Sequence, residues 1–256
     1  QENIKLNFIN RSNDINNSEV VIFQKNVAET FDELAVAWRV IQNCGRNDNH
    51  PFNYPLQFQV CASDSYGNYS PELTAYEGQS FEMVKDTSGD VLKISPTPAV
   101  SAQEVEIKNN LSTGAISGNI YRDGKLLAAK TNVAPGQKGV FQFKPSIFIG
   151  TASQIVEGDV MNSAIIQQIN TEINLFGIQS ADIVMTGGGS GPGATAFSFH
   201  LENINNLSLQ HVFSIGDNDS NLSAYKIEHP LEAEKDCSDL KAALKLVTRS
   251  YSKISL

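Results

Sequence analysis

The sequence predicts a mainly β protein made of two consecutive β-sandwich-like units followed by a C-terminal helix. Apolar and polar residues alternate along several short segments, and this period of two is typical of strands that bury one face. The clearest segments are Ile4–Phe8, Tyr54–Ala62, Val105–Ile107, Ile169–Leu175 and Phe197–Leu201. Asp123-Gly124, between two strand-like segments, suits the left-handed conformations of a tight hairpin turn. These patterns predict short strands joined by turns, as in a β-sandwich.

Two breaks in the pattern predict the boundaries of the units. Two prolines interrupt Ser95–Ser101, so we expect one unit at residues 1–97 and a second at residues 98–224. The composition changes again around Gly216–Ser223, and beyond it apolar residues recur at spacings of three and four. This helical stripe consists of Cys237, Leu240, Leu244, Val247 and Tyr251. We expect a helix within residues 225–256 that docks on the β units or, as the alternative, contacts a partner.

Three further segments are assigned from their local patterns. The short apolar run Val20–Phe23 predicts a deeply buried strand. Leu34–Val40 alternates as a strand does, although Thr30–Glu33 resembles the capping box of a helix, and we favour the strand. Val160–Gln168 fits a helix or a strand, because four of its residues would share one helical face.

Charge and composition restrict the classes of partner. The 256 residues carry a formal charge of −9, so no excess of Lys and Arg is available to neutralise phosphates, and we predict no nucleic-acid binding. No apolar run reaches the roughly 18 residues of a membrane-spanning helix, so we expect no transmembrane segment. The chain begins at Gln1 without an apolar leader, which leaves the compartment open. We favour a secreted or cell-surface protein over a cytoplasmic one.

The cysteines and histidines show no recognisable catalytic or metal-binding pattern. Cys44, Cys61 and Cys237 are odd in number, and we expect free thiols, with a Cys44–Cys61 disulfide as the alternative. The histidines are His50, His200, His211 and His229. A metal site that includes His200, His211 and the nearby Glu202 is less favoured than exposed histidines on a sheet face. We predict a protein that is not an enzyme and that needs no organic cofactor.

The loops at the ends of the sandwiches are where a ligand site is expected. Candidate loops are Asn10–Asn17, Asn43–Asn53 and Thr186–Gly193. The second loop and the strand after it contain a mixture of charged and aromatic residues: Arg46, Asp48, His50, Phe52 and Tyr54. Aromatic rings stack on sugar faces while polar groups bind hydroxyls, so this mixture predicts a glycan site, although an ordinary hairpin loop is the simpler interpretation.

Two other stretches carry backbone or side-chain groups that bind ions. Gly187, Gly188 and Gly189 offer backbone N–H groups to an anion, but we favour a flexible hairpin loop that forms the rim of a binding site. Asp217, Asp219 and Asn221 place oxygen atoms at alternate positions, as calcium loops do. The glycine and the distal glutamate of an EF-hand are missing, so a solvated turn is favoured and calcium is the alternative.

Several segments, taken in order, resemble the bacterial rhizosphere-expressed protein RhiA and its relatives. The matching segments are Asn10–Ser12, Val21–Gln24, Leu34–Trp38, Pro145–Ile149 and Glu157–Val160. They span about residues 1–205, and the helical stripe after Pro230 lies outside them. The resemblance implies a bacterial, β-rich protein, and it transfers no functional residue to this chain.

These observations favour a non-enzymatic recognition protein, lectin-like or adhesive, that binds a glycan or another surface ligand. One alternative is a membrane-active, toxin-like β protein, because alternating amphipathic segments can rearrange into a barrel. Another is a structural or self-assembling protein that forms homo-oligomers through its C-terminal helix or its strand edges.

Overall fold

The computed structural model describes residues 3–29 and 35–207. The chain divides into two compact units, residues 1–205 and 206–256, and the fold below is that of the first unit. The C-terminal helix predicted within residues 225–256 lies outside the described residues, as does the second predicted break.

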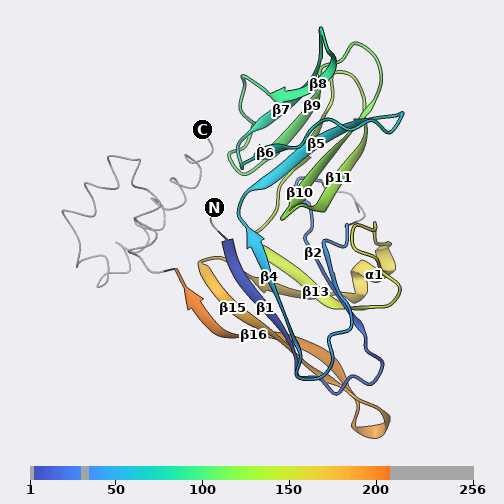
Figure 1. The fold of residues 1–256 in the computed structure, drawn as a ribbon, viewed down its shortest axis with the longest axis vertical. Helices are drawn as coiled ribbons and strands as arrows, with labels where there is room; N and C mark the ends of the chain where they lie inside the picture. The colour runs from blue at the N-terminus through green and yellow to red at the C-terminus, as the bar shows by residue number, and fades with distance from the viewer. Residues whose placement is uncertain (1–2, 30–34, 208–256) are drawn as a thin grey trace, which may run out of the picture. The chain divides into compact units, whose positions relative to one another are not determined.

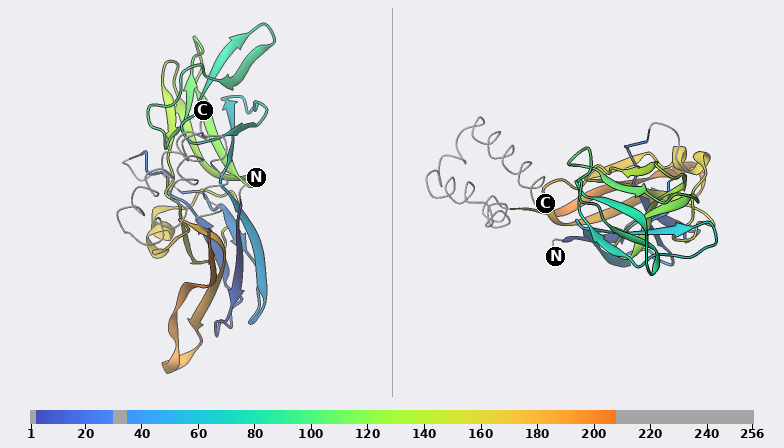
Figure 2. Two further views of the ribbon diagram at one scale, coloured as in Figure 1. Left: turned by 90° about the vertical axis from the view of Figure 1, so that its left-hand side faces the viewer. Right: turned by 90° about the horizontal axis from the view of Figure 1, so that it is seen from above.

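Within the described residues, sixteen strands form four four-stranded sheets, arranged as two sandwiches (Figures 1 and 2). The first sandwich has the sheets β16-β15-β1-β4 and β14-β13-β2-β3. Its strands are β1 (Asn3–Asn10), β2 (Glu19–Phe23), β3 (Arg39–Ile41), β4 (Asn49–Pro55), β13 (Ser146–Ala152), β14 (Thr171–Asn174), β15 (Ile178–Gly188) and β16 (Thr195–Asn206). The mainly β prediction is confirmed.

The other sandwich, which we call the inserted sandwich, has the sheets β11-β10-β5-β6 and β12-β9-β7-β8. Its strands are β5 (Phe58–Asp64), β6 (Leu73–Ala75), β7 (Ser80–Asp86), β8 (Gly89–Ile94), β9 (Val105–Asn109), β10 (Ile116–Arg122), β11 (Lys125–Val133) and β12 (Lys138–Phe141). The turn predicted at Asp123-Gly124 joins β10 to β11, and both residues have positive φ angles, 55° and 68°.

The two sandwiches are nested in the sequence, whereas the sequence analysis expected them to be consecutive. β1 pairs in parallel with β15, and β2 pairs with β13, so the first sandwich unites residues 3–55 with residues 146–206. β5 pairs with β10 and β7 pairs with β9, on either side of the boundary expected at residue 97. The chain therefore crosses between the sandwiches twice, after β4 and after β12.

The proline-bearing loop at residues 95–101 covers a sheet instead of separating two units. It connects β8 to β9, and the N–H of Val100 donates a hydrogen bond of 3.0 Å to Oε1 of Glu106. Glu106 lies between two core residues of β9 and is fully buried. Nζ of Lys138, on β12, lies 2.6 Å from the same carboxylate oxygen. The break in the apolar pattern marks a loop that packs over a buried carboxylate.

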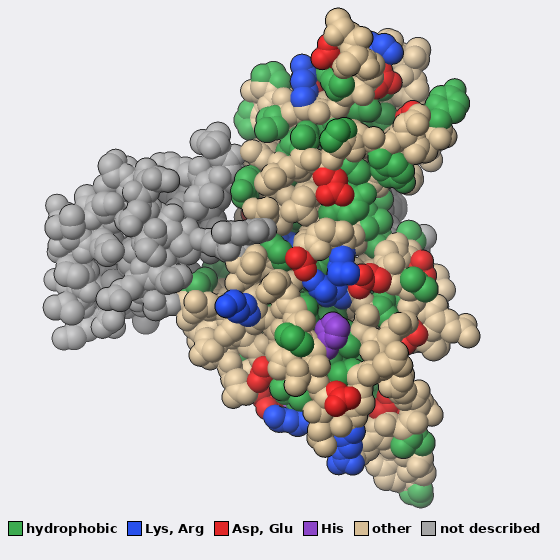
Figure 3. Space-filling view, in the orientation of Figure 1, with side chains coloured by type: hydrophobic (Ala, Val, Ile, Leu, Met, Phe, Trp, Pro, Cys, Tyr) green, Lys and Arg blue, Asp and Glu red, His purple; other side chains and the backbone are tan. Residues whose placement is uncertain are grey.

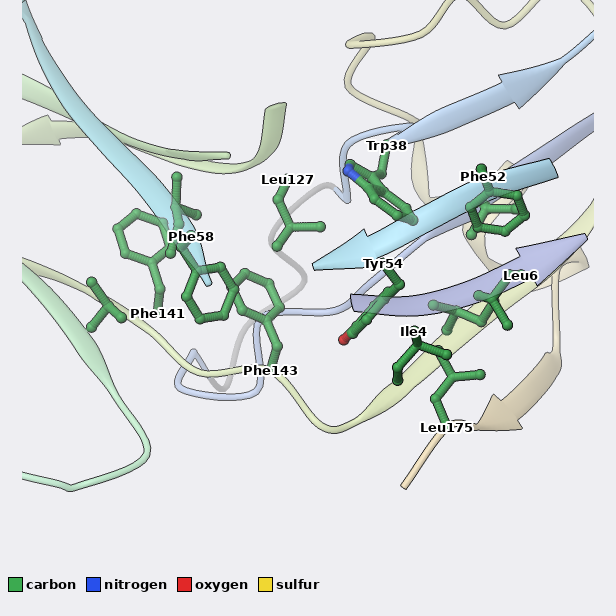
Figure 4. Close-up of a cluster of buried hydrophobic side chains, with 14 of the residues drawn as sticks. Ile4, Leu6, Trp38, Phe52, Tyr54, Phe58, Leu127, Phe141, Phe143 and Leu175 are labelled. Carbon is green, nitrogen blue, oxygen red and sulfur yellow. The ribbon is translucent and has the colours of Figure 1, made fainter. Parts of the chain in front are cut away.

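The predicted alternation matches the observed core. Ile4, Leu6 and Phe8 are buried, and the side chains of both sandwiches form one hydrophobic cluster (Figure 4). The segment Tyr54–Ala62 is split, because β4 ends at Pro55 in one sandwich and β5 begins at Phe58 in the other. The period of two thus continues through the first crossing.

The three segments assigned from local patterns have clear outcomes. Residues 20–23 lie in β2 and are fully buried, as predicted. In the described part of Leu34–Val40, Val36 forms an isolated bridge with Val160 and β3 begins at Arg39, so the predicted strand is present only in part. The segment Val160–Gln168 contains a helix, because α1 spans Ser163–Gln168. No helix in residues 3–29 and 35–207 is long and apolar enough to cross a membrane.

Arg122, at the end of β10, occupies the centre of the junction between the sandwiches. Its side chain is buried, and its guanidinium donates a hydrogen bond to the carbonyl of Pro55 at the first crossing. The guanidinium carbon lies 4.1 Å from the ring centroid of Tyr54 and 4.3 Å from that of Phe58. The backbone carbonyl of Arg122 accepts a 2.9 Å hydrogen bond from Nε1 of Trp38. One arginine therefore contacts both sandwiches.

Gln24 ties the second crossing to the same junction. Its side chain is buried directly after β2, and its Nε2 lies 2.9 Å from the hydroxyl of Tyr54. The same nitrogen donates to the carbonyl of Ser146 at 2.8 Å, where the chain re-enters the first sandwich. Tyr54 thus lies between Gln24 and Arg122, and polar contacts connect the two crossings.

Ion pairs surround this buried core of the junction. Arg39 on β3 pairs with Asp123 in the β10–β11 turn, and Lys125 on β11 pairs with Glu157 in the connection after β13. Each pair joins the first sandwich to the inserted one. On the face shown in Figure 3, basic and acidic side chains are interspersed. Exposed pairs contribute little each, so they complement the buried contacts rather than replace them.

We predict that Lys138→Met destabilises the protein through Glu106. Burial alone would raise the pKa of the Glu106 carboxyl, but hydrogen bonds from Lys138 and Val100 hold that pKa below its ordinary value. Glu106 therefore stabilises the fold at neutral pH, and this contribution is lost as the pH falls through the carboxyl's lowered pKa. Removing the ammonium group leaves a buried carboxylate short of a partner, so the free energy of unfolding should fall by about 1–3 kcal/mol.

Urea denaturation at pH 7 measures the effect. Lys85→Met is the matched control, because the Lys85–Asp90 pair on the β7–β8 hairpin is largely exposed and its loss should cost about 0.5 kcal/mol or less. Equal midpoints for the two variants would contradict the role assigned to Glu106.

Candidate functional site

The three loops predicted to bind ligands are adjacent, and β1 connects them. The N–H of Asn47, in the loop before β4, donates to the carbonyl of Asn10 at 2.6 Å. On the other side, the N–H of Asn13 donates to the carbonyl of Gly187 at 2.7 Å. The segment after β1 therefore pairs with both neighbouring loops and gathers them at one end of its sheet.

Asn10 fixes the geometry of this end. Its side chain is buried, and Nδ2 donates to the carbonyl of Cys44 at 2.7 Å. Its Oδ1 accepts hydrogen bonds from the N–H and the hydroxyl of Ser12, at 2.9 Å and 2.6 Å. Because these bonds are internal, Asn10 holds the loops in place and is not available to a ligand.

A cavity of about 300 Å³ lies in the loop between β3 and β4. Its lining residues are all polar or weakly polar: Gln42, Asn43, Cys44, Asn47, Asp48, Asn49 and His50. We call this space the loop cavity. Its volume is at the lower end of the range for small-molecule sites, about 300–1,000 Å³, so it suits a small ligand or one unit of a larger one.

Asp48 and Cys44 are the chemically distinctive residues of the loop cavity. The carboxylate of Asp48 accepts a 3.1 Å hydrogen bond from the N–H of Gly45. Partial burial and the negative charge of Asp48 raise the pKa of the Cys44 thiol. The thiol therefore stays neutral at pH 7, which does not favour it as a nucleophile. Cys44 and Cys61 are both free, as expected, and Cys237 lies outside the described residues.

The structure separates the five predicted glycan-binding residues. Asp48 and His50 line the loop cavity, and Arg46 is exposed in the same loop without lining it. Phe52 and Tyr54 are 6% and 3% exposed and pack against Trp38, so they belong to the core and provide no stacking surface. The physical reason is the alternation along β4, which turns both rings inward.

The glycine run has a structural role in the hairpin between β15 and β16. The expected hairpin is present, and its tip is the light orange loop at the lower right of Figure 1. Gly187, Gly188 and Gly189 all have positive φ angles. A Cβ on Gly187 would lie 2.1 Å from the carbonyl oxygen of Ala196, and one on Gly188 would lie 2.6 Å from the ring of Phe197. These glycines allow close strand approach, and they do not line the loop cavity.

The described residues include His200 and Glu202 of the predicted metal ligands and none of the others. Asp217, Asp219, Asn221 and His211 lie outside them. His200 is exposed, and its Nε2 lies 2.9 Å from Glu202, which also pairs with Arg11 at 2.7 Å. In the part of the chain that the structure describes, no three His, Cys, Asp or Glu residues are close enough to hold a metal ion.

Sequence analysis missed the asparagines that dominate the loop cavity. Asn43 and Asn47 have φ angles of 54° and 68°, a conformation that asparagine adopts more readily than most residues. The signal in the sequence is the density of asparagine between Asn43 and Asn53, whereas the predicted glycan site rests on the charged and aromatic residues of that loop.

Comparison of the chain with protein-family models, curated proteins and solved structures found no match. The resemblance to RhiA therefore stays a prediction, and the function must be argued from the site itself.

We predict that Asp48→Asn makes Cys44 react with iodoacetamide at lower pH. The substitution removes the negative charge beside the thiol, so the pKa of Cys44 should fall and more thiolate should be present at a given pH. Mass spectrometry of the Cys44 peptide across pH 7–10 follows the reaction. Asp90→Asn, far from the cavity in the β7–β8 hairpin, is the control. If Cys44 reacted with the same pH dependence in wild type and Asp48→Asn, the charge of Asp48 would not act on the Cys44 thiol.

Proposed function

We propose that this protein is a non-enzymatic recognition protein that binds a neutral, hydroxyl-rich ligand, a glycan, in the loop cavity. The observation that carries the proposal is the lining of the cavity, in which side-chain amides, one carboxylate and one imidazole surround a space of about 300 Å³. An amide both donates and accepts hydrogen bonds, as a sugar hydroxyl does, so these groups are complementary.

The charges around the loop cavity support a neutral ligand over an anion. Asp48 is the charged residue of the lining, and the chain as a whole carries −9. Negative potential repels phosphates and carboxylates. Because Phe52 and Tyr54 are buried, recognition would rest on hydrogen bonds rather than on ring stacking, and we expect modest affinity for a single sugar unit.

We predict selective retention of a neutral glycan on a glycan array. The full chain is applied with calcium and, separately, with a chelator. Calcium-dependent binding would assign a role to Asp217, Asp219 and Asn221, and calcium-independent binding would leave the loop cavity as the site. A blank array under both conditions would contradict the proposal.

Variants locate the binding. Asn47→Gly removes an amide from the lining while glycine retains the positive φ of 68°, and His50→Ala removes the imidazole. Together they should weaken binding about tenfold or more, since each hydrogen bond contributes about 0.5–1.5 kcal/mol. Asn132→Gly is the matched control, because Asn132 also has a positive φ, 56°, but lies on β11 of the inserted sandwich. Unchanged affinity in the double variant would exclude the loop cavity.

A further inference from the structure

A second cavity, of about 230 Å³, lies where the chain returns from the inserted sandwich to the first one. We call it the crossing cavity. Its lining residues are Gln24, Lys25, Val27, Lys144, Ser146, Phe148 and Glu172. They come from the segment after β2, from Lys144 before β13, and from β13 and β14. None of them lines the loop cavity, so the two sites are independent.

The aromatic floor of the crossing cavity is a half-buried ring. Phe148 on β13 is paired in register with Phe23 on β2 and with Glu172 on β14. The rings of Phe148 and Phe23 stack with centroids 5.3 Å apart and planes inclined by 16°. Phe148 therefore lies in a row of three neighbouring side chains, with a carboxylate on one side and an aromatic partner on the other.

Two lysines of the crossing cavity have no carboxylate partner among the described residues. Nζ of Lys25 lies 4.3 Å from the ring centroid of Phe148, and Lys144 is exposed on the segment before β13. Across the described ranges, the ion pairs involve other lysines and leave these two unmatched. Two ammonium groups at one small cavity favour an anionic group of a ligand.

The cavity also offers a hydrogen-bond acceptor, the carboxylate of Glu172. Glu172 is oriented by the hydroxyl of Ser146, which donates to its Oε1 at 2.6 Å. Gln24 is 2% exposed, and its Nε2 contacts the hydroxyl of Tyr54 and the carbonyls of Lys144 and Ser146. Its Oε1 has no hydrogen-bond partner within the described residues. Because this Oε1 atom is itself buried, a ligand in the cavity does not reach it, and Glu172 is the acceptor that the ligand's donor would meet.

We infer that the crossing cavity binds a small carboxylate that carries a hydrogen-bond donor beside it, of which a free α-amino acid is the simplest example. The ligand carboxylate lies between Lys25 and Lys144, and its donor group faces Glu172. A phosphate satisfies the lysines but leaves Glu172 facing a like charge, so the carboxylate is favoured. A ligand amino group, protonated at neutral pH, would form both an ion pair and a hydrogen bond with the Glu172 carboxylate. A ligand hydroxyl group would form only the hydrogen bond.

The test is a titration of the isotopically labelled full chain, monitored by amide NMR signals. The probes are single L-amino acids, lactate, acetate and inorganic phosphate. We expect at least one amino acid to shift the signals of residues 24–27, 144–148 and 172. The affinity for acetate should be lower by about tenfold or more, because acetate lacks the hydrogen-bond donor. Failure of every amino acid and of lactate to shift these signals would overturn the inference.

Variants assign the contacts. Lys25→Met with Lys144→Met should weaken binding about tenfold or more, while Lys85→Met, an exposed lysine of the inserted sandwich, should leave it unchanged. Glu172→Gln should weaken amino acids more than lactate. Equal loss in the double variant and in Lys85→Met would overturn the inference. Because the glycan test uses other residues, either proposal can fail while the other holds.

Discussion

The fold depends on a buried arginine at the point where two sandwiches meet. Burial of a guanidinium is unfavourable unless its charge and its N–H groups find partners. Arg122 meets this requirement in part, with the carbonyl of Pro55 and the ring faces of Tyr54 and Phe58, while its buried Nε has no hydrogen-bond partner among the described residues. Burial lowers the pKa of Arg122, and the negative charge of the nearby Glu77 opposes that shift. These partners come from both sandwiches, so Arg122 gains all of these contacts only when the two are docked.

Nesting makes this junction necessary. The inserted sandwich is tied to the first by two crossings, and each crossing carries polar backbone that must find hydrogen bonds away from water. Arg122 donates a hydrogen bond to the Pro55 carbonyl at the first crossing, and Gln24 donates one to the Ser146 carbonyl at the second. The crossing cavity lies beside Gln24 at the second crossing. The loop cavity depends instead on Asn10, which holds the end of the first sandwich.

The sequence predicted local features well and long-range ones poorly. Alternation is a property of neighbouring residues, so strands such as Ile4–Phe8 were found, whereas the pairing of β1 with β15 joins residues about 175 positions apart and leaves no local trace. For the site, the loops were located but not their chemistry. Tyr54 appeared both in an apolar alternation and as a glycan-binding ring, and the alternation was the better guide. The asparagines at 43 and 47 matter through backbone angles that composition alone does not reveal.

The fluorescence of Trp38 tests most directly whether the two sandwiches dock through Arg122. Trp38 is the only tryptophan of the chain, and its indole donates a hydrogen bond to the Arg122 carbonyl. Urea unfolding of wild type and Arg122→Met is followed by Trp38 fluorescence and by far-ultraviolet circular dichroism. Methionine keeps much of the packing but leaves the Pro55 carbonyl and Glu77 without the positive charge of the guanidinium. The free energy of unfolding measured by Trp38 fluorescence should therefore fall by about 3 kcal/mol or more. A Trp38 transition with the wild-type midpoint and slope would show that the sandwiches dock without the buried arginine.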